Sequence, residues 1–238
     1  MKFSCAVLLF SMPLFASTSD FKFGHESELS IVNTGGNSQL ETYNAKTVNT
    51  LKKERNKFEL SGHYTYGKSD DVASARNWSA LARYDRFTSD ILSVFLAEKI
   101  EGNKFQGLES RYNTDLGLSY MFFETKNSSL QGEVGYRYTY EKSTDSETGS
   151  ENFQKGRLYL EHWLKLNETV RTRFWVEYLP NFTESEEYIF SFEPSLRVSL
   201  NSIFSLSVAY KGVYENEPAA IGRKKYDYMY TTSLIARF

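Results

Sequence analysis

Three histidines are the first residues of this chain that could do chemistry. His63 lies between Ser61 and Thr65, and His162 lies among leucines. A histidine beside a serine or a carboxylate can act as the general base of ester hydrolysis. No recognisable nucleophile motif accompanies these two histidines or His25, and no Gly-rich phosphate loop, calcium loop or metal-ligand spacing occurs. We therefore expect no enzymatic function, no metal and no cofactor, and we keep a lipid hydrolase that uses His63 as an alternative.

Arginines and acidic residues form the second chemically active set. They recur at every second position of several segments, which places them on one face of extended chain. Seven arginines and seven acids share this phase: Arg111, Asp115, Glu133, Arg137, Glu141, Arg157, Glu161, Arg171, Arg173, Glu177, Glu193, Arg197, Asp227 and Arg237. Arg83 and Asp85 are expected to join them. Because arginine forks bridge carboxylates on adjacent strands, the equal numbers predict a network of ion pairs, either structural or pore-lining, without a surplus of one sign.

The segments that carry these residues are predicted to be β-strands. In the last segment, from Tyr226 to Phe238, every second side chain is apolar, aromatic or small, which is the period of a strand. The same pattern predicts twelve strands, although the phase of the second and fifth is ambiguous. Their ranges are 21–32, 38–51, 57–68, 77–88, 91–101, 109–122, 129–142, 153–166, 169–180, 188–200, 203–214 and 226–238.

The composition fits strands that face lipid on one side and water on the other. The chain has 17 Tyr and 18 Phe, yet 24% of its residues are charged. Past residue 16 no run approaches the roughly 20 apolar residues that a membrane helix needs. The 28 basic and 30 acidic residues leave no basic excess for nucleic acid. We therefore expect an all-β, antiparallel transmembrane barrel of about 12 strands.

The first residues have the form of a secretory signal peptide. One lysine, an apolar run from Phe3 to Ala16 and small residues after it predict that residues 1–19 are removed. The barrel domain would then comprise residues 20–238. Because Cys5 is the only cysteine and leaves with the signal peptide, we expect no thiol in the mature protein.

The connections between the predicted strands alternate in length. Short turns such as 89–90 and 201–202 alternate with longer polar loops such as 143–152 and 215–224. Short periplasmic turns and longer outer loops are typical of outer-membrane barrels, so we expect both termini in the periplasm. The acidic loops offer an alternative function, surface binding, through Asp145, Glu147, Glu151, Glu184, Glu186 and Glu187.

Several short motifs resemble one protein family when they are taken in order. They are Glu26–Asn37, Arg83–Phe87, Glu98–Tyr112, Gly117–Tyr120, Gly132–Tyr138 and Glu217–Gly222. In this order they resemble the YdiY-like barrels labelled salt-induced outer membrane proteins, a family of unknown function. The first turn reads Thr34-Gly35-Gly36-Asn37, where the family has Ser-Gly-Asn. The resemblance implies an outer-membrane barrel and a link to salt or envelope stress, and it supplies no activity or site residues.

The sequence therefore predicts a bacterial outer-membrane barrel that is structural or forms a narrow pore of low selectivity. Its expected partners are outer-membrane lipid, lipopolysaccharide and, during biogenesis, the barrel-assembly machinery. The final strand resembles the C-terminal signal that this machinery recognises, through Tyr228, Tyr230 and Phe238. The sequence does not predict a solute or an oligomeric state.

Overall fold

The structure is a computed structural model that describes residues 21–238 with gaps at 35–39, 70–71, 104, 106, 146–148 and 218–223. The described chain forms twelve strands: β1 Lys22–Thr34, β2 Leu40–Lys53, β3 Asn56–Ser69, β4 Val72–Phe87, β5 Leu92–Asn103, β6 Leu108–Glu124, β7 Ser128–Ser143, β8 Ser150–Lys165, β9 Val170–Pro180, β10 Tyr188–Ser199, β11 Phe204–Glu215 and β12 Tyr226–Arg237. Within the described residues, no helix has the length and apolar character to cross a membrane. The predicted signal peptide with Cys5, Gly35–Asn37, Glu147 and residues 218–222 lie outside the described residues.

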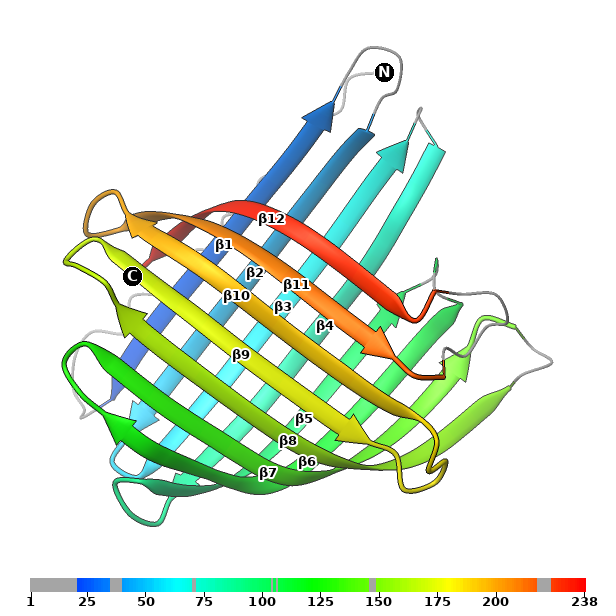
Figure 1. Cartoon of the computed structure of the whole chain (residues 1–238), viewed down its shortest axis with the longest axis horizontal. Helices are drawn as coiled ribbons and strands as arrows, with labels where there is room; N and C mark the ends of the chain where they lie inside the picture. The colour runs from blue at the N-terminus through cyan, green and yellow to red at the C-terminus, as the bar shows by residue number, and fades with distance from the viewer. Residues whose placement is uncertain are drawn as a thin grey trace.

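The strands form one closed barrel, in which each strand pairs antiparallel with its neighbours in sequence and β12 returns to β1 (Figure 1). This confirms the predicted antiparallel barrel of twelve strands. Two strands begin earlier than predicted, β4 at Val72 and β8 at Ser150. The added residues are mostly small or polar, so no apolar alternation marks them in the sequence. Backbone pairing holds them nonetheless, because β3 pairs with the start of β4 across a register shift at Gly67 and Lys68.

The outward face of the barrel carries an apolar band between two aromatic rims. Exposed aliphatic side chains in the middle of the strands include Leu29, Leu60, Leu96, Leu116, Leu158, Leu196 and Leu234. Exposed phenylalanines at the end of the barrel near the chain termini include Phe23, Phe58, Phe122, Phe204 and Phe238, and exposed tyrosines at the other end include Tyr43, Tyr64, Tyr112, Tyr138 and Tyr228. Aromatic girdles on either side of an apolar band are the outer surface of a transmembrane barrel.

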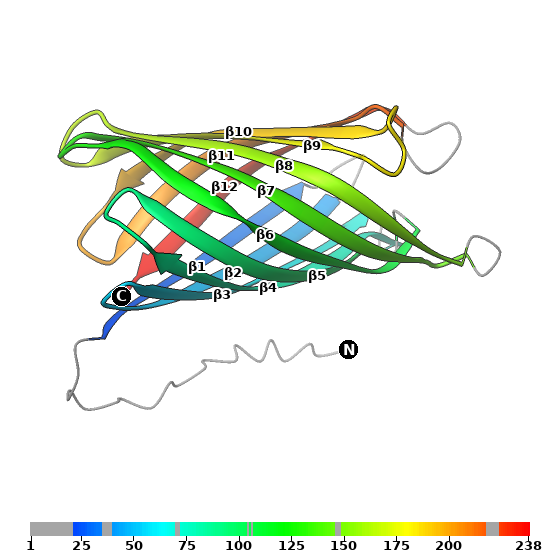
Figure 2. The same cartoon turned by 90° about the horizontal axis from the view of Figure 1, so that it is seen from below.

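The two ends of the barrel differ. The first residues of β1, the end of β12 and the short turns lie together at one end, which we call the terminal end (Figure 2). The longer connections lie at the opposite end, which we call the loop end. Asn167 and Asn201 fix two of the short turns, since each side-chain oxygen accepts two backbone N–H groups of its turn at 2.7–2.9 Å. That the terminal end faces the periplasm stays a prediction.

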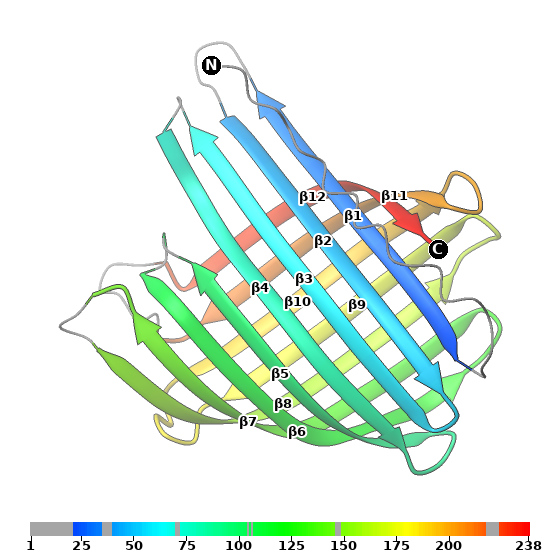
Figure 3. The same ribbon diagram turned by 180° about the vertical axis from the view of Figure 1, so that it is seen from behind.

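Few residues pair where β1 meets β12 and closes the barrel. All 13 residues of β1, on the wall that faces the viewer in Figure 3, pair with β2. Only Glu26 to Leu29 pair with β12 in the register. His25 and Phe238 add two backbone hydrogen bonds, of 3.0 and 2.9 Å. Phe238 therefore supplies two of the bonds that close the sheet.

We expect deletion of Phe238 to lower the amount of folded barrel in the outer membrane. The deletion removes both bonds to His25 and the last residue of the predicted assembly signal. Each bond contributes about 0.5–1.5 kcal/mol, so the folded barrel should persist while its delivery suffers. Met229→Ala is the matched control, because Met229 lies on the same strand but faces the lumen. The measurement is heat-modifiable gel mobility of outer-membrane fractions; equal folded amounts of the deletion, the control and wild type would contradict the prediction.

Candidate functional site

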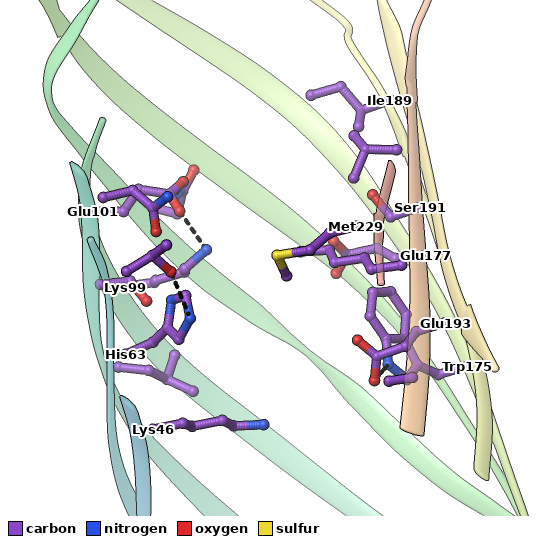
Figure 4. Close-up of a pocket in the computed structure, with 18 of the residues that line it drawn as sticks. Lys46, His63, Lys99, Glu101, Trp175, Glu177, Ile189, Ser191, Glu193 and Met229 are labelled. Carbon is purple, nitrogen blue, oxygen red and sulfur yellow. Dashed lines mark hydrogen bonds and ion pairs between the residues drawn. The ribbon is translucent and has the colours of Figure 1, made fainter. Parts of the chain in front are cut away.

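A cavity of about 740 Å³ extends along the lumen, from Leu179 and Ile189 near the loop end to Trp163 and Arg197 near the terminal end. Its lining on β10 runs from Ile189 to Arg197, and its lining on β8 runs from Lys155 to Trp163. Two walls face each other across it (Figure 4), with Lys46, His63, Lys99 and Glu101 on one side and Trp175, Glu177, Ile189, Ser191, Glu193 and Met229 on the other. The cavity wall is thus made of charged, polar and aromatic side chains from nearly every strand.

Glu133 of β7 is the centre of an ion-pair network in the wall of the cavity, which Arg83 and Arg157 line. Its Oε1 accepts a hydrogen bond from Arg83 Nη2 at 2.8 Å, and its Oε2 accepts one from Arg157 Nη1 at 2.5 Å. Arg83 also donates to Asp85 at 2.6 Å, and Arg157 Nε donates to Glu177 at 2.7 Å. Glu133 is only 6% exposed. Because each arginine binds two carboxylates, the buried charges of this part of the wall are compensated.

Arg137 extends the same network across β6 and β9. It binds Asp115 through two parallel hydrogen bonds of 2.6 and 2.7 Å. Its Nη2 also lies 3.8 Å from Glu177 Oε2. The bidentate geometry fixes the guanidinium plane, so this arginine belongs to the rigid wall of the cavity.

Phe95 of β5 fills the wall beneath the arginines. Its ring faces the lumen side of the sheet but is only 1% exposed. The guanidinium carbon of Arg83 lies 4.2 Å from the ring centroid, and that of Arg157 lies 5.7 Å away. Gly117 and Gly135 leave room for the ring, since a Cβ on either would lie 2.7 or 3.4 Å from Phe95 Cζ. Two glycines and two arginines therefore enclose one phenylalanine in the wall of the barrel.

Glu161 organises a second network toward the terminal end. It accepts hydrogen bonds from Tyr159 Oη at 2.6 Å, Trp163 Nε1 at 2.9 Å and Arg173 Nε at 2.7 Å. Trp163 therefore faces the lumen. It occupies the inward phase of β8, and its N–H donates to a carboxylate there.

The aromatic residue Trp175 stands beside a lysine of β11. Its Nε1 donates to Glu193 at 3.2 Å, and Lys211 Nζ lies 6.0 Å from its ring centroid. Neither Lys211 nor Lys46 makes an ion pair with any residue that the structure describes. Both line the cavity, and they are the lysines of its described lining that make no ion pair, although Lys46 lies opposite Glu28 in the register.

On the wall that carries Lys99, the charged side chains near the loop end form ion pairs with one another. Lys99 Nζ lies 2.5 Å from Glu101 Oε2, and Arg111 lies 3.4 Å from Glu101 and 2.7 Å from Glu141. These contacts join β5, β6 and β7. The pairs neutralise one another, so this rim adds little net field to the cavity.

Glu26 joins the two ends of the sheet inside the lumen. It accepts hydrogen bonds from Arg197 at 2.9 and 3.0 Å and from Arg237 at 2.6 and 3.1 Å. Arg197 comes from β10 and Arg237 from β12, so one carboxylate of β1 holds three strands. This contact stabilises the short closure between β1 and β12, the seam of the barrel, from the lumen side.

The structure places all twelve predicted network residues on the inward phase of their strands. They are Arg111, Asp115, Glu133, Arg137, Arg157, Glu161, Arg171, Arg173, Glu177, Glu193, Arg197 and Arg237. Arg171 makes no ion pair with a described residue, unlike Arg173. Tyr228 lies on the outward face and Phe238 at the seam.

Sequence reasoning missed several lumen residues, and most of them come from two strands. Lys46 lies on β2, and Phe95, Lys99 and Glu101 lie on β5. Those are the two strands whose phase is ambiguous in the sequence. Their phase becomes visible only through the register, which places Lys46 opposite His63.

His63, the histidine of the hydrolase alternative, has no free nucleophile beside it. Its Nε2 lies 3.2 Å from Thr65 Oγ1, but that hydroxyl donates its proton to Asn44 Oδ1 at 2.7 Å. The site also lines the lumen, away from lipid. Among the described residues, no group of three His, Cys, Asp or Glu side chains could hold a metal.

Some acidic residues predicted to bind at the surface already contact other residues of the protein. Glu187 lies 2.7 Å from Lys155 Nζ and accepts a hydrogen bond from Asn181 Nδ2 at 2.7 Å. Glu151 lies in β8, opposite Glu141. Glu184 and Glu186 remain on an exposed loop.

Solved structures with the same fold are outer-membrane porins and channels. The COG4313 outer membrane channel from Pseudomonas putida F1 is 8% identical, with a TM-score of 0.57 over 94% of this chain and 97% of that one. The NanC porin is 10% identical, with a TM-score of 0.53 over 91% and 98%. The KdgM porin in complex with disordered oligogalacturonate is 10% identical, with a TM-score of 0.50 over 90% and 98%. At these identities the likeness concerns the fold.

The remaining comparisons concern the sequence. A family described as "Protein of unknown function, DUF481" matches residues 27–238. No curated protein matches the chain. The closed barrel, its outward apolar band and the fold it shares with outer-membrane channels locate this protein in the outer membrane.

Proposed function

The chain belongs to the DUF481 family of proteins of unknown function, and we propose that its barrel is a narrow passage of low selectivity for small solutes. The passage runs through the cavity and past the Glu133 network, whose Arg83, Arg137 and Arg157 line it.

One observation carries the proposal: a cavity of about 740 Å³ with a largely charged and polar wall extends along the lumen from the loop end toward the terminal end. A polar cavity of this size holds water, and small hydrated solutes can replace that water. A barrel that served only as a rigid body would gain more from a packed lumen. A closed structural barrel is nevertheless the second candidate, because Phe95 and the Glu133 network narrow the path.

The charges of the lining explain why we expect low selectivity. Most arginines of the wall bind carboxylates at 2.5–3.1 Å, so their fields cancel within the network. Lys46 and Lys211 line the cavity without an ion pair among the described residues. They should give the passage a weak preference for anions.

Solute uptake into liposomes tests the passage. Liposomes that contain the folded barrel should swell in small neutral sugars and in amino acids, and more slowly as the solute grows. The empty-liposome control should not swell. Swelling that is equal to the control for the smallest solutes would favour the closed structural barrel.

The remaining expectations complete the proposal. Removal of residues 1–19 would deliver the domain of residues 20–238, whose partners would be outer-membrane lipid, lipopolysaccharide and the assembly machinery. Tyr228, Tyr230 and Phe238 would form the assembly signal. The envelope-stress role implied by the family resemblance would appear as a rise in protein amount in high salt. Surface binding is a lesser alternative, since Glu187 is already paired with Lys155.

A further inference from the structure

Each of the three histidines has a hydroxyl within hydrogen-bond distance, but only one has both ring nitrogens engaged within the described part of the chain. His63 faces Thr65, whose proton is already donated. His162 Nε2 lies 2.9 Å from Ser128 Oγ, and its Nδ1 has no hydrogen-bond partner among the described residues. His25 differs from both.

His25 of β1 binds a serine and an asparagine at once. Its Nε2 lies 2.8 Å from Ser27 Oγ, two residues further along the same face of the strand. Its Nδ1 lies 2.7 Å from Asn49 Oδ1. Asn49 lies on β2, directly opposite His25 in the register. Three side chains from two adjacent strands thus form a continuous chain of hydrogen bonds.

The asparagine oxygen sets the tautomer of the ring. An amide oxygen can only accept, so Nδ1 must carry the proton that it donates to Asn49. Nε2 then has a lone pair, which accepts the proton of the Ser27 hydroxyl. A base held in this way by a third group is the arrangement that activates a serine nucleophile.

The triad lies on the outward face of the barrel at the phenylalanine rim. Phe23 precedes His25 on the same face and is 55% exposed, and Phe238 lies 6.1 Å from the His25 ring between centroids. Leu29 and Leu234 extend this face toward the apolar band. An aromatic rim marks the boundary between hydrocarbon and head groups, which is the depth at which lipid ester carbonyls lie.

We propose that Ser27, His25 and Asn49 form a hydrolytic site for the acyl esters of membrane lipids. Ser27 and His25 are its catalytic residues, and Asn49 is a positioning residue. Thr47 lies opposite Ser27 in the register, so its side chain belongs to the same face. We assign its hydroxyl as the donor to the ester carbonyl oxygen, which becomes negative when Ser27 attacks. The site is independent of the lumen, and it departs from the expectation that the chain has no enzymatic function.

The chemistry balances with water as the only co-reactant. Ser27 Oγ attacks the ester carbonyl carbon while its proton passes to His25 Nε2. The carbon–oxygen bond to the alcohol then breaks, and Nε2 returns the proton to the departing oxygen, which leaves an acyl group on Ser27. Water attacks this acyl ester, gives one proton to Nε2 and releases the fatty acid as the proton returns to Ser27 Oγ.

Two measurements on the folded full-length barrel test the site. In mixed micelles of phosphatidylethanolamine and detergent, wild type should release fatty acid, and a fluorophosphonate probe should label Ser27, as located by peptide mass. Ser27→Ala should abolish both, and His25→Ala should lower the rate by about 10²–10⁴-fold. Asn49→Ala should lower both release and labelling, whereas Asn49→Asp should retain them, because a carboxylate also accepts from Nδ1.

Matched variants separate the site from the fold and from the lumen. Ser128→Ala removes the hydroxyl beside His162 and should leave hydrolysis unchanged. A lumen variant such as Glu133→Gln should change conductance and not hydrolysis, whereas the triad variants should do the reverse. Absence of release and of labelling in folded wild type, or release that survives Ser27→Ala, would overturn the proposal. If Ser27→Ala does not fold, the labelled residue of wild type decides alone.

Discussion

A Glu133→Gln barrel should prefer anions and unfold more easily than wild type. Glu133 accepts hydrogen bonds from Arg83 and Arg157 at 2.8 and 2.5 Å in a part of the wall that is almost fully buried. The substitution keeps the volume but removes one negative charge between two guanidinium groups. Breaking a buried pair from one side costs about 3–5 kcal/mol. The measurements are the reversal potential in a salt gradient and the thermal or denaturant unfolding midpoint.

Glu98→Gln is the control for that experiment. Glu98 lies on β5 in the outward phase, where it accepts a hydrogen bond from Thr114 at 2.6 Å. Its replacement removes the same charge outside the lumen. The reversal potential should stay at the wild-type value. Equal reversal potentials for both variants and wild type would show that Glu133 does not set the field of the passage.

Phe95→Ala should widen the passage and destabilise the barrel. The ring is enclosed by Arg83 above and by Gly117 and Gly135 beneath, and neither glycine has a side chain to fill the space. Loss of a buried phenylalanine ring costs about 3–5 kcal/mol. The arginines lose their apolar support at the same time, so this part of the lumen wall should loosen. Single-channel conductance should rise, and the unfolding midpoint should fall.

Leu96→Ala is the control for Phe95→Ala, because it shortens a side chain of the same strand on the outward face of the barrel. Leu96 is the next residue along β5 and is 53% exposed toward lipid. We expect its replacement to leave conductance unchanged. A rise in conductance for both variants would point to general loosening of β5 and would remove Phe95 from the constriction.

Much of the fold follows from alternation alone, because every second residue of a strand must face lipid. The final strand from Tyr226 shows this pattern over its whole length, and its predicted and observed bounds agree within one residue. The start of β4 does not show it. Residues 73–76 lack large apolar side chains, so their pairing depends on backbone bonds that composition does not reveal.

The residues of the candidate sites could be predicted only where the alternation of their strand is clear in the sequence. Arg137 and Asp115 are found from the sequence, because β6 and β7 have a clear phase. The side chain of Phe95 is missed, because both phases of β5 carry apolar residues. The triad of His25, Ser27 and Asn49 is harder still. The spacing of His25 and Ser27 is visible, but Asn49 joins them only through the register of a neighbouring strand.

A planar-bilayer recording of the wild-type barrel is the most direct test of the proposed passage. Paired charges around Glu133 and a ring held beneath Arg83 narrow the lumen, and Lys46 and Lys211 line it without an ion pair among the described residues. We therefore expect small, stable conductance steps with a reversal potential displaced only slightly toward anions. Large openings of the kind that wide porins show, or strong preference for cations, would contradict it.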